Sequence, residues 1–420
     1  MTPTVTGALD RVLGARLPAP PEQLRRGPFR RGAFASPLHS ERRAARTGAF
    51  LGIAFTVCFL TGLISHWVQQ PPGWFSWPAS PSWLYRVTQG THVATGLASI
   101  PLLLVKLWTV YPKLFEWPPA GSPSRAVSRL AVLVLVGTSV MQLLTGLINI
   151  AEWYPFGFFF TTTHYWTGWI AIGAVLVHVG AKAPEIRRGL ARRGSPAATA
   201  GLDDEQAAEL TAVDDEAETG GVPRRAFVLA AGLAVGAVTL TTVGQSFTPL
   251  ARVSVLGPRI AGVGPQGLPV RQTAEKAGTT DVGADYRLVV EGPQRLELSL
   301  ADLQAFPQRT ERLPISCVEG WSANATWTGV RLADLLEAAG LPPGTEVTVE
   351  SLQTGGLYRV STVSAPHARS PRTLLALRLN GEELAPDHGY PVRLIAPNRP
   401  GVMQTKWVTR VAPGTGGIGG

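Results

Sequence analysis

Cysteine is scarce in this sequence of 420 residues, which contains only Cys58 and Cys317. Cys58 lies inside a long apolar run and Cys317 lies outside all such runs, so we do not expect the two to form a disulfide. Cys317 could be a metal ligand, because a thiolate is a soft ligand whose charge a metal stabilises. It could equally be a small buried hydrophobic residue. The residue alone leaves both interpretations open.

Charged residues are also few, at 16% against 45% hydrophobic residues, and the chain carries 12 tryptophans. This composition is unusual for a soluble protein and typical of one that is partly embedded in a membrane. The net charge of +9 would suit a nucleic-acid-binding protein, but no nucleic-acid motif accompanies it. The basic residues cluster beside apolar runs, so membrane topology explains them better and we expect no nucleic-acid partner.

The N-terminal half predicts a membrane domain. Residues 1–47 are rich in proline, glycine and arginine, with no short apolar segment like a cleavable signal peptide, and predict a basic cytoplasmic tail. Each of five later apolar runs is long enough to cross about 30 Å of hydrocarbon as a helix. The runs predict an all-α four-helix membrane bundle over residues 48–182 and one anchor helix within residues 224–250. They cover residues 48–66, 87–108, 130–151, 163–181 and 226–248.

The segments that join these runs are alternately poor and rich in basic residues. Residues 67–86 contain a single basic residue and residues 152–162 none, whereas residues 111–129 and 182–225 contain several. The positive-inside rule therefore places the N-terminus in the cytoplasm and everything after the fifth helix outside, as in a multi-pass protein of the cell membrane. Acidic clusters in an Ala/Thr background predict a disordered cytoplasmic linker over residues 183–223.

Two arginines stand just before the fifth apolar run. The sequence Pro-Arg-Arg-Ala-Phe-Val-Leu at residues 223–229 resembles a twin-arginine export signal. Alternatively, Arg224 and Arg225 only set the topology of the helix. The apolar run shows no clear small-residue cleavage site, so we expect it to stay in the membrane as an anchor.

Four histidines lie in or at the apolar runs: His66, His92, His164 and His178. An ionisable residue inside a membrane span is a candidate functional group by default. Because His164 and His178 are 14 residues apart, a helix would place them on one face and roughly 21 Å apart. The alternative is that these histidines only form hydrogen bonds between helices.

This spacing resembles that in the four-helix membrane cytochromes b of respiratory dehydrogenases, where one helix carries two haem-ligating histidines. The resemblance implies a haem b bound by His92 and His164 near the outer surface, and an inner haem on His178 is possible. The partner of His178 stays open, since His39 lies below the first span and Lys106 is expected to snorkel. His66 at the outer interface is more typical of a polar cap.

From residue 268 onward the pattern changes to an α+β domain. Short β-rich runs at residues 286–290, 346–351 and 392–395 alternate with Pro/Gly turns. A helix is predicted at residues 332–339, ended by Gly340 and Pro342. No internal repeat is present.

Four ordered motifs in this domain resemble the sulfite oxidase superfamily, most closely the catalytic subunit of the bacterial periplasmic methionine sulfoxide reductase. The resemblance spans residues 268–412, within a predicted domain of residues 268–414. The motifs are Tyr-Arg-Leu-Val-Val-Glu-Gly at residues 286–292, Cys-Val-Glu-Gly-Trp-Ser at 317–322, Asp-His-Gly-Tyr-Pro-Val-Arg at 387–393 and Thr-Lys-Trp at 405–407.

The resemblance implies that Cys317 is the one protein ligand to a molybdenum held by molybdopterin, and that Glu319 lines the catalytic pocket. Arg and backbone amides suit the anionic phosphate of that cofactor. The other cofactor-binding residues it implies are Arg271, Thr273, His388, Arg393, Arg399, Thr405 and Lys406. His388 could touch the pterin or only cap its turn.

The chain also departs from the reductase pattern near the substrate pocket. Pro400 replaces an aromatic residue, Met403 replaces a lysine, and residues 270–274 replace an Asn-rich segment. We therefore predict a membrane-anchored molybdopterin oxidoreductase that acts on a small S- or N-oxide by oxo transfer and exchanges electrons with quinone through haem. One alternative is a sulfite-type dehydrogenase that reduces quinone. Another is a non-catalytic membrane receptor that binds an anion in the same fold.

Overall fold

The computed structural model describes residues 34, 39–115, 123–192, 194–208, 224–257, 259, 262–342 and 344–414. Most of the predicted N-terminal tail and residues 209–223 of the predicted linker lie outside these ranges, as does Pro223 of the twin-arginine motif. The chain forms two compact units. The first contains Met1–Phe59 and Ala94–Thr239, and the second contains Leu60–Val93 and Leu240–Gly420.

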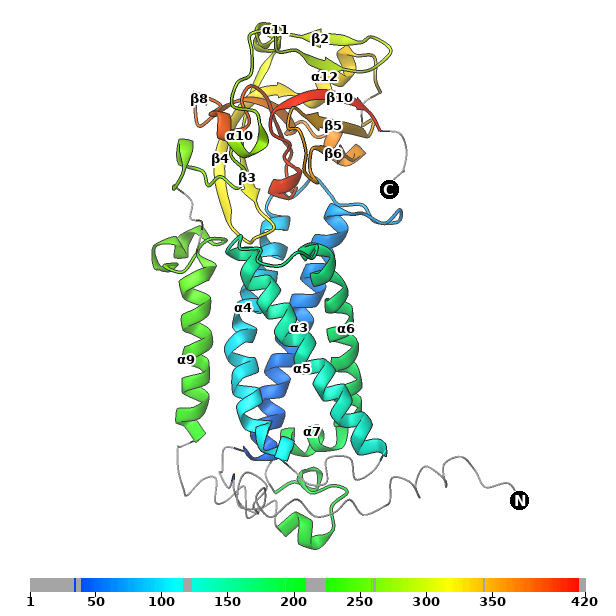
Figure 1. Cartoon of the computed structure of the whole chain (residues 1–420), viewed down its shortest axis with the longest axis vertical. Coiled ribbons are helices and arrows are strands. Elements are labelled where there is room, and N and C mark those ends of the chain that lie inside the picture. The colour runs from blue at the N-terminus through cyan, green and yellow to red at the C-terminus, as the bar shows by residue number, and fades with distance from the viewer. Residues whose placement is uncertain are drawn as a thin grey trace, which may run out of the picture. The chain divides into compact units, whose positions relative to one another are not determined.

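The first unit is helical (Figure 1). Within it, α4 and α3 are joined by the ammonium group of Lys106, which donates to Ala44 O at 2.7 Å. Gln142 Nε2 donates to His164 O at 2.6 Å and so joins α5 to α6. The four helices are α3 (Glu41–Gln69), α4 (Leu84–Val110), α5 (Pro123–Ile150) and α6 (Phe160–Ala181).

The outer faces of these helices are apolar. Leu133 on α5 is 68% exposed and Leu176 on α6 is 67% exposed, which is what lipid-facing positions require. Among the described residues, four helices are long and apolar enough to cross a membrane. A fifth is added if α6 and α7 (Ala183–Leu190), bent by 73°, count as one span. The four are α3, α4, α5 and α9 (Arg224–Val243). With the bent pair that begins with α6, they coincide with the five predicted apolar runs.

The helix α7 occupies part of the predicted disordered linker. Arg188 Nε forms an ion pair with Glu41 Oε1 at 3.2 Å, and Arg42 Nη1 donates to Ala191 O at 2.9 Å. These contacts attach α7 to the first turn of α3. The prediction of a disordered segment is therefore wrong for residues 183–190, where tertiary contacts stabilise a helix too short to be stable alone.

The C-terminal part of the second unit contains two five-stranded sheets with short helices between strands. One sheet has the order β2-β1-β10-β5-β6, and in the other β3, β4, β7 and β8 follow one another while β9 also pairs with β7. The strands are β1 (Leu288–Val290), β2 (Leu296–Leu298), β3 (Gln308–Ser316), β4 (Ser322–Arg331), β5 (Val347–Ser351), β6 (Val360–Val363), β7 (Leu374–Leu379), β8 (Glu382–Glu383), β9 (Arg393–Ile395) and β10 (Val408–Pro413). The short helices are α10 (Ala274–Ala277), α11 (Leu300–Ala305), α12 (Leu332–Ala338) and α13 (Ala365–Ala368).

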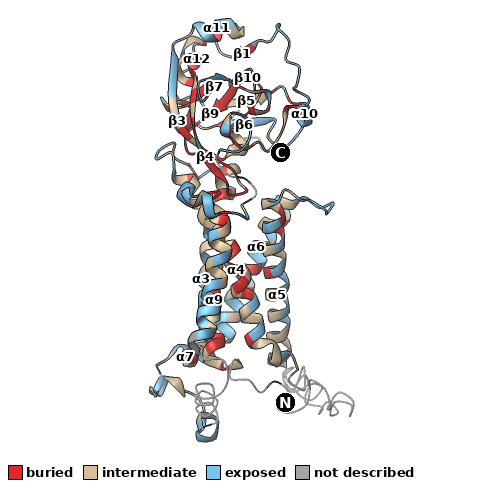
Figure 2. Ribbon diagram, turned by 90° about the vertical axis from the view of Figure 1, so that its left-hand side faces the viewer, coloured by how far each residue is buried: buried red, intermediate tan, exposed pale blue. Residues whose placement is uncertain are grey.

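The core of this α+β part forms where the strands present alternate apolar side chains to α12. Leu335 and Leu336 of α12 pack with Val290, Val349 and Val411 in one fully buried cluster. Burial is concentrated on the strands (Figure 2). The predicted strands at residues 286–290, 346–351 and 392–395 are confirmed as β1, β5 and β9, and the predicted helix at residues 332–339 as α12.

The second unit also includes the ends of α3 and α4 with the segment between them. Asn398 is the main anchor of that segment. Its side-chain Oδ1 accepts from Tyr85 N at 2.6 Å, and its Nδ2 donates to Pro78 O at 2.6 Å. Its backbone oxygen accepts from Trp77 Nε1 at 2.8 Å. Asn398 is only 2% exposed and its φ of 57° lies in the left-handed region, which asparagine tolerates better than most residues.

Candidate molybdopterin site

Cys317 lies in the tight loop that joins β3 to β4. The strands are paired up to Ser316 and Ser322, whose hydroxyls share a hydrogen bond of 2.8 Å. Cys317 N donates to Trp321 O at 2.9 Å and closes the loop. Gly320 has a φ of 97°, a conformation that favours glycine. The thiol is therefore held in one place by backbone geometry and is 2% exposed.

The same loop contacts the beginning of α4 within the second unit. Gln89 Nε2 donates to Val318 O. A Cβ atom on Gly320 would lie 2.7 Å from Cγ2 of Val93, so only glycine allows this close approach. The loop that carries Cys317 thus packs against the helix that carries His92.

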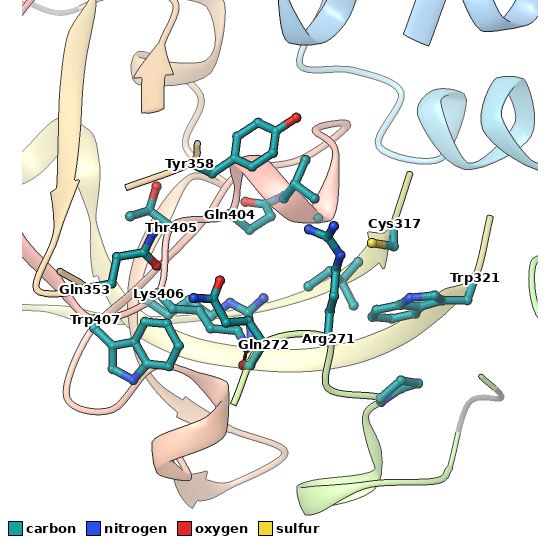
Figure 3. Close-up of a pocket in the computed structure, with 15 residues that line it drawn as sticks. Arg271, Gln272, Cys317, Trp321, Gln353, Tyr358, Gln404, Thr405, Lys406 and Trp407 are labelled. Atoms are coloured by element: carbon teal, nitrogen blue, oxygen red, sulfur yellow. Dashed lines mark hydrogen bonds between the residues drawn. The ribbon is translucent and has the colours of Figure 1, made fainter. Parts of the chain in front are cut away.

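A cavity of about 610 Å³, including its part open to solvent, lies beside Cys317 (Figure 3). Three cationic side chains line it and no carboxylate does, so the cavity is suited to an anion. Its lining comprises Pro269, Arg271, Gln272, Ile315, Cys317, Trp321, Gln353, Tyr358, Arg393, Gly401, Val402, Gln404, Thr405, Lys406 and Trp407.

Lys406 is fixed at the wall of this cavity. Its Nζ donates to Gln272 O at 2.8 Å and to Asp387 O at 2.6 Å, and it lies 5.2 Å from the centre of the Trp407 ring. Burial lowers the pKa of Lys406 well below its usual range, and the neighbouring Arg393 adds to that effect. An ammonium group with two of its three protons bonded to carbonyl oxygens retains one donor for a ligand.

Arg393 and Arg399 are buried guanidinium groups. Arg393 Nη1 donates to His388 O at 3.2 Å and Arg399 Nη2 donates to Thr362 O at 2.6 Å. Arg393 Nε and Arg399 Nη1 are buried without a hydrogen-bond partner. Burial lowers the pKa of each group to about 10, so both stay charged at neutral pH. Arg393 lines the cavity, whereas Arg399 is outside its lining.

Within the part of the chain that the structure describes, none of Lys406, Arg393 and Arg399 forms an ion pair with a carboxylate. Buried charges without a counter-ion are costly, and a bound anion would compensate them. The phosphate of molybdopterin would be such an anion. Cys317 offers a thiolate, the soft ligand that the resemblance to the sulfite oxidase superfamily implies for molybdenum. The residues present therefore fit this cofactor.

Glu319 is buried beside the thiol and contacts the exposed Arg271 and the buried Trp321. Its Oε1 pairs with Arg271 Nε at 2.5 Å, and its Oε2 accepts from Trp321 Nε1 at 3.1 Å. Burial raises the pKa of the Cys317 thiol well above its usual value, and the Glu319 carboxylate raises it further, while Arg271 lowers it. Without a metal this cysteine is a thiol, so metal binding must displace its proton.

Three other predicted residues occupy different positions. Thr405 lines the cavity and its hydroxyl bonds to Ser361 Oγ at 2.6 Å. Thr273 caps α10 by accepting from Lys276 N and lies outside the lining. His388 Nε2 donates to Pro265 O at 2.7 Å, and burial followed by the charge of Arg393 lowers its pKa to about 4. His388 therefore holds its turn and does not line the cavity.

Some lining residues were not predicted from the sequence. Gln353 and Tyr358 come from the connection between β5 and β6, and Gln404 precedes the Thr-Lys-Trp motif. Burial raises the pKa of the Tyr358 phenol. None of these residues lies in a motif with recognisable spacing, so only the tertiary fold identifies them.

The membrane histidines lie in separate parts of the structure. His164 and His178 share α6, and the hydroxyl of Thr145 shares a hydrogen bond of 2.8 Å with His164 Nδ1 in the first unit. In the second unit, the ring of His92 lies against Gly62, where a Cβ would be 2.7 Å from Cε1. Among the described residues no group of three or more His, Cys, Asp or Glu could hold a metal ion. The pairing of His92 with His164 stays a prediction.

Comparison with known proteins defines the class of this domain. Residues 276–414 match the oxidoreductase molybdopterin binding domain. Residues 276–414 thus form an oxidoreductase molybdopterin binding domain, and sulfite oxidases are similar to this part of the chain.

Individual relatives are similar over this part only. The sulfite oxidase of Gallus gallus is 35% identical over 159 residues, which cover 31% of this chain and 35% of that protein. Mitochondrial sulfite oxidase of Homo sapiens is 34% identical over 156 residues, or 30% and 29% of the two chains. The uncharacterized oxidoreductase YuiH of Bacillus subtilis is 32% identical over 112 residues, or 26% and 55%. The chain spans about a third of the length of these sulfite oxidases.

Among solved structures, the sulfane dehydrogenase SoxCD from Paracoccus pantotrophus aligns with a TM-score of 0.32 and 27% identity. This alignment covers 36% of the present chain and 43% of the other.

Proposed function

We propose that this chain is a membrane-anchored molybdopterin oxidoreductase that acts by oxo transfer on a small substrate outside the cytoplasm and exchanges electrons with quinone through haem b. The observation that carries the proposal is the cavity beside Cys317, where Arg393 and Lys406 have no carboxylate partner among the described residues. When bound there, the molybdenum cofactor supplies the two-electron chemistry. The protein's own residues bind it and shape the site.

Each group has a definite task in this proposal. Cys317 would lose its proton and hold the metal as its thiolate ligand. Lys406 and Arg393, which line the cavity, would bind the anionic part of the cofactor, and the buried Arg399 would add positive charge. Arg271 pairs with Glu319 and so offsets part of the repulsion between that carboxylate and the thiolate, while the other Glu319 oxygen orients Trp321. Cys317, Glu319 and Arg393 are buried, which excludes water and strengthens their interactions.

The substrate we favour is an S- or N-oxide, which the enzyme would reduce with electrons from quinol. Sulfite oxidation with electron delivery to quinone is the second candidate, and the similarity to two sulfite oxidases favours it. The positions that differ from the reductase, Pro400 and Met403, lie next to the cavity-lining residues Gly401 and Val402. Membranes assayed with sulfite, with sulfoxides or N-oxides plus a quinol, and with no substrate distinguish the two directions.

The electron route is proposed from His92 and His164. Support comes from the contact of Gln89 with Val318, because Gln89 precedes His92 by three residues on α4 and Val318 follows the molybdenum ligand directly. A short path through packed protein suits electron transfer from an outer haem. The proposed partners are therefore quinone, membrane lipid and the small substrate.

One experiment tests the whole assignment: metal analysis and a reduced-minus-oxidised spectrum of the purified protein. We expect molybdenum and at least one haem b per chain, with the haem lost in His92→Ala and in His164→Ala. If the wild-type protein contains haem without molybdenum and Cys317 reacts freely with an alkylating reagent, the chain is instead a binding protein. A spectrum that survives His92→Ala would refute the proposed ligand.

A further inference from the structure

A hydrogen-bonded chain leads from the cavity into the end of α3. Tyr358 lines the cavity with Cys317, and its hydroxyl donates to Gln69 Oε1 at 2.7 Å. In Figure 3 this hydroxyl points away from Lys406 and Trp407. Gln69 is the last residue of α3 and belongs to the same compact unit as Tyr358.

The contacts of the Gln69 amide nitrogen with Ser65 determine how the amide is oriented. Gln69 Nε2 donates to the backbone oxygen of Ser65 at 3.0 Å and lies 3.4 Å from Ser65 Oγ. Because a backbone carbonyl only accepts, the amide nitrogen must face Ser65 and the amide oxygen must face Tyr358. Ser65 Oγ and the hydroxyl of Tyr85 share a hydrogen bond of 3.0 Å, and both residues are buried.

A phenol has one proton to donate. In this arrangement Tyr358 donates that proton to Gln69, so toward the cavity it can only accept a hydrogen bond. We infer that Gln69 is a positioning residue of the molybdopterin site that withholds the Tyr358 proton from the cavity. The inference rests on the proposed function and adds to it a residue from the membrane-spanning half of the chain.

Gln69 lies outside the residues 276–414 that match the molybdopterin domain. The restraint on Tyr358 is therefore built by the N-terminal helices of this particular chain. It implies that an oxyanion, which only accepts hydrogen bonds, receives no hydrogen bond from Tyr358 while the Tyr358 proton is donated to Gln69. Releasing the phenol should add one donor to the anion-binding groups of the cavity.

The test compares the wild type with four variants of the full-length protein in lipid nanodiscs, each with 3-fluorotyrosine at position 358. Gln69→Met keeps the side-chain volume and removes the acceptor, whereas Gln69→Glu keeps an acceptor oxygen. Gln70→Met is the matched control, since Gln70 is the exposed neighbour. Sulfate serves as an inert oxyanion probe, and the 19F resonance reports its binding without any turnover.

We expect Gln69→Met to shift the 19F resonance and to lower the Kd for sulfate about fivefold, which is the factor for one net hydrogen bond. Gln69→Glu and Gln70→Met should match the wild type. The shorter Gln69→Ser removes the same contact without apolar bulk and should behave like Gln69→Met. A resonance and a sulfate Kd that are unchanged in both Gln69→Met and Gln69→Ser would overturn the inference.

This result is separable from the proposed function. The fluorine signal needs no molybdenum, so it tests the Gln69 contact even in protein that lacks the metal. Absence of molybdenum from the wild type would refute the proposed function, whereas an unaltered Tyr358 environment would refute only the role of Gln69. In loaded enzyme the same variant should change the KM for sulfite more than kcat, which a general loss of stability would not do.

Discussion

Replacing Asn398 should loosen the attachment of the segment at residues 72–85 without altering the cavity lining. Asn398→Gly removes the two side-chain hydrogen bonds to Tyr85 N and Pro78 O. At about 1 kcal/mol each, their loss should cost about 2 kcal/mol. Asn398→Ala should cost about 1 kcal/mol more, because a φ of 57° is unfavourable for alanine and not for glycine.

Hydrogen exchange of the full-length protein in nanodiscs measures this opening. The amides of Phe75 and Leu84 are suitable reporters, because they donate to Pro72 O and Pro81 O and lose no direct partner in either variant. Their protection should fall about 30-fold in Asn398→Gly and about 150-fold in Asn398→Ala.

Asn380 supplies the matched control. It also has a left-handed φ, of 53°, and its side chain likewise bonds to two backbone groups, Thr326 N and Gln266 O. Because Asn380 is exposed and contacts only the C-terminal part of the chain, Asn380→Gly should leave the reporter amides protected. Equal protection in wild type and Asn398→Gly would show that Asn398 does not anchor the segment.

Three further predictions concern the ligand, the pH dependence and export. Cys317→Ser should abolish molybdenum-dependent turnover while the helices still fold, because a hydroxyl is a harder and less acidic ligand; full turnover would remove the molybdenum assignment. His388 has a folded pKa of about 4, below its unfolded value near 6.5, so only the unfolded state binds its proton between those pH values. Stability should therefore fall by up to about 1.4 kcal/mol per unit as the pH drops through that window, and His388→Gln should reduce the slope of melting temperature against pH. Changing both Arg224 and Arg225 to Lys should keep the C-terminal domain inside the cell, and unchanged access of external protease to that domain would exclude a twin-arginine signal.

The parts of the fold that the sequence predicts are those determined by local features, namely apolar runs and helix-ending residues. The helix α12 is bounded as expected because Gly340 and Pro342 end it. Apolar runs locate the long helices, but not their polar first turns. The helix α5 begins at Pro123, whereas its apolar run begins at residue 130, since Ser124 and Arg125 are helical without being apolar. Residues 183–190 were predicted wrongly because the contacts that order α7 come from α3.

Some residues of the candidate site could likewise be predicted from the sequence and others could not. Cys317, Arg393 and Lys406 lie in motifs, and the structure places all three around one cavity. Tyr358 lies in a connection without such a motif. Gln69 is 289 positions away from Tyr358, so no pattern in the sequence indicates that they meet. Long-range packing, rather than local propensity, determines this part of the site.

The position of β10 has a consequence for how the protein is made. In the first sheet, β10 alone joins the hairpin of β1 and β2 to the hairpin of β5 and β6, and it follows all four of these strands in the sequence. The sheet is therefore completed only after its other four strands have been synthesised. About 165 residues separate the end of α9 from the start of β10, which is roughly 10–30 s of synthesis. Between the synthesis of β6 and that of β10, the nascent chain carries a hydrophobic helix and two hairpins whose edges β1 and β5 have no partner strand. A chaperone that binds this intermediate should protect the edges of β1 and β5.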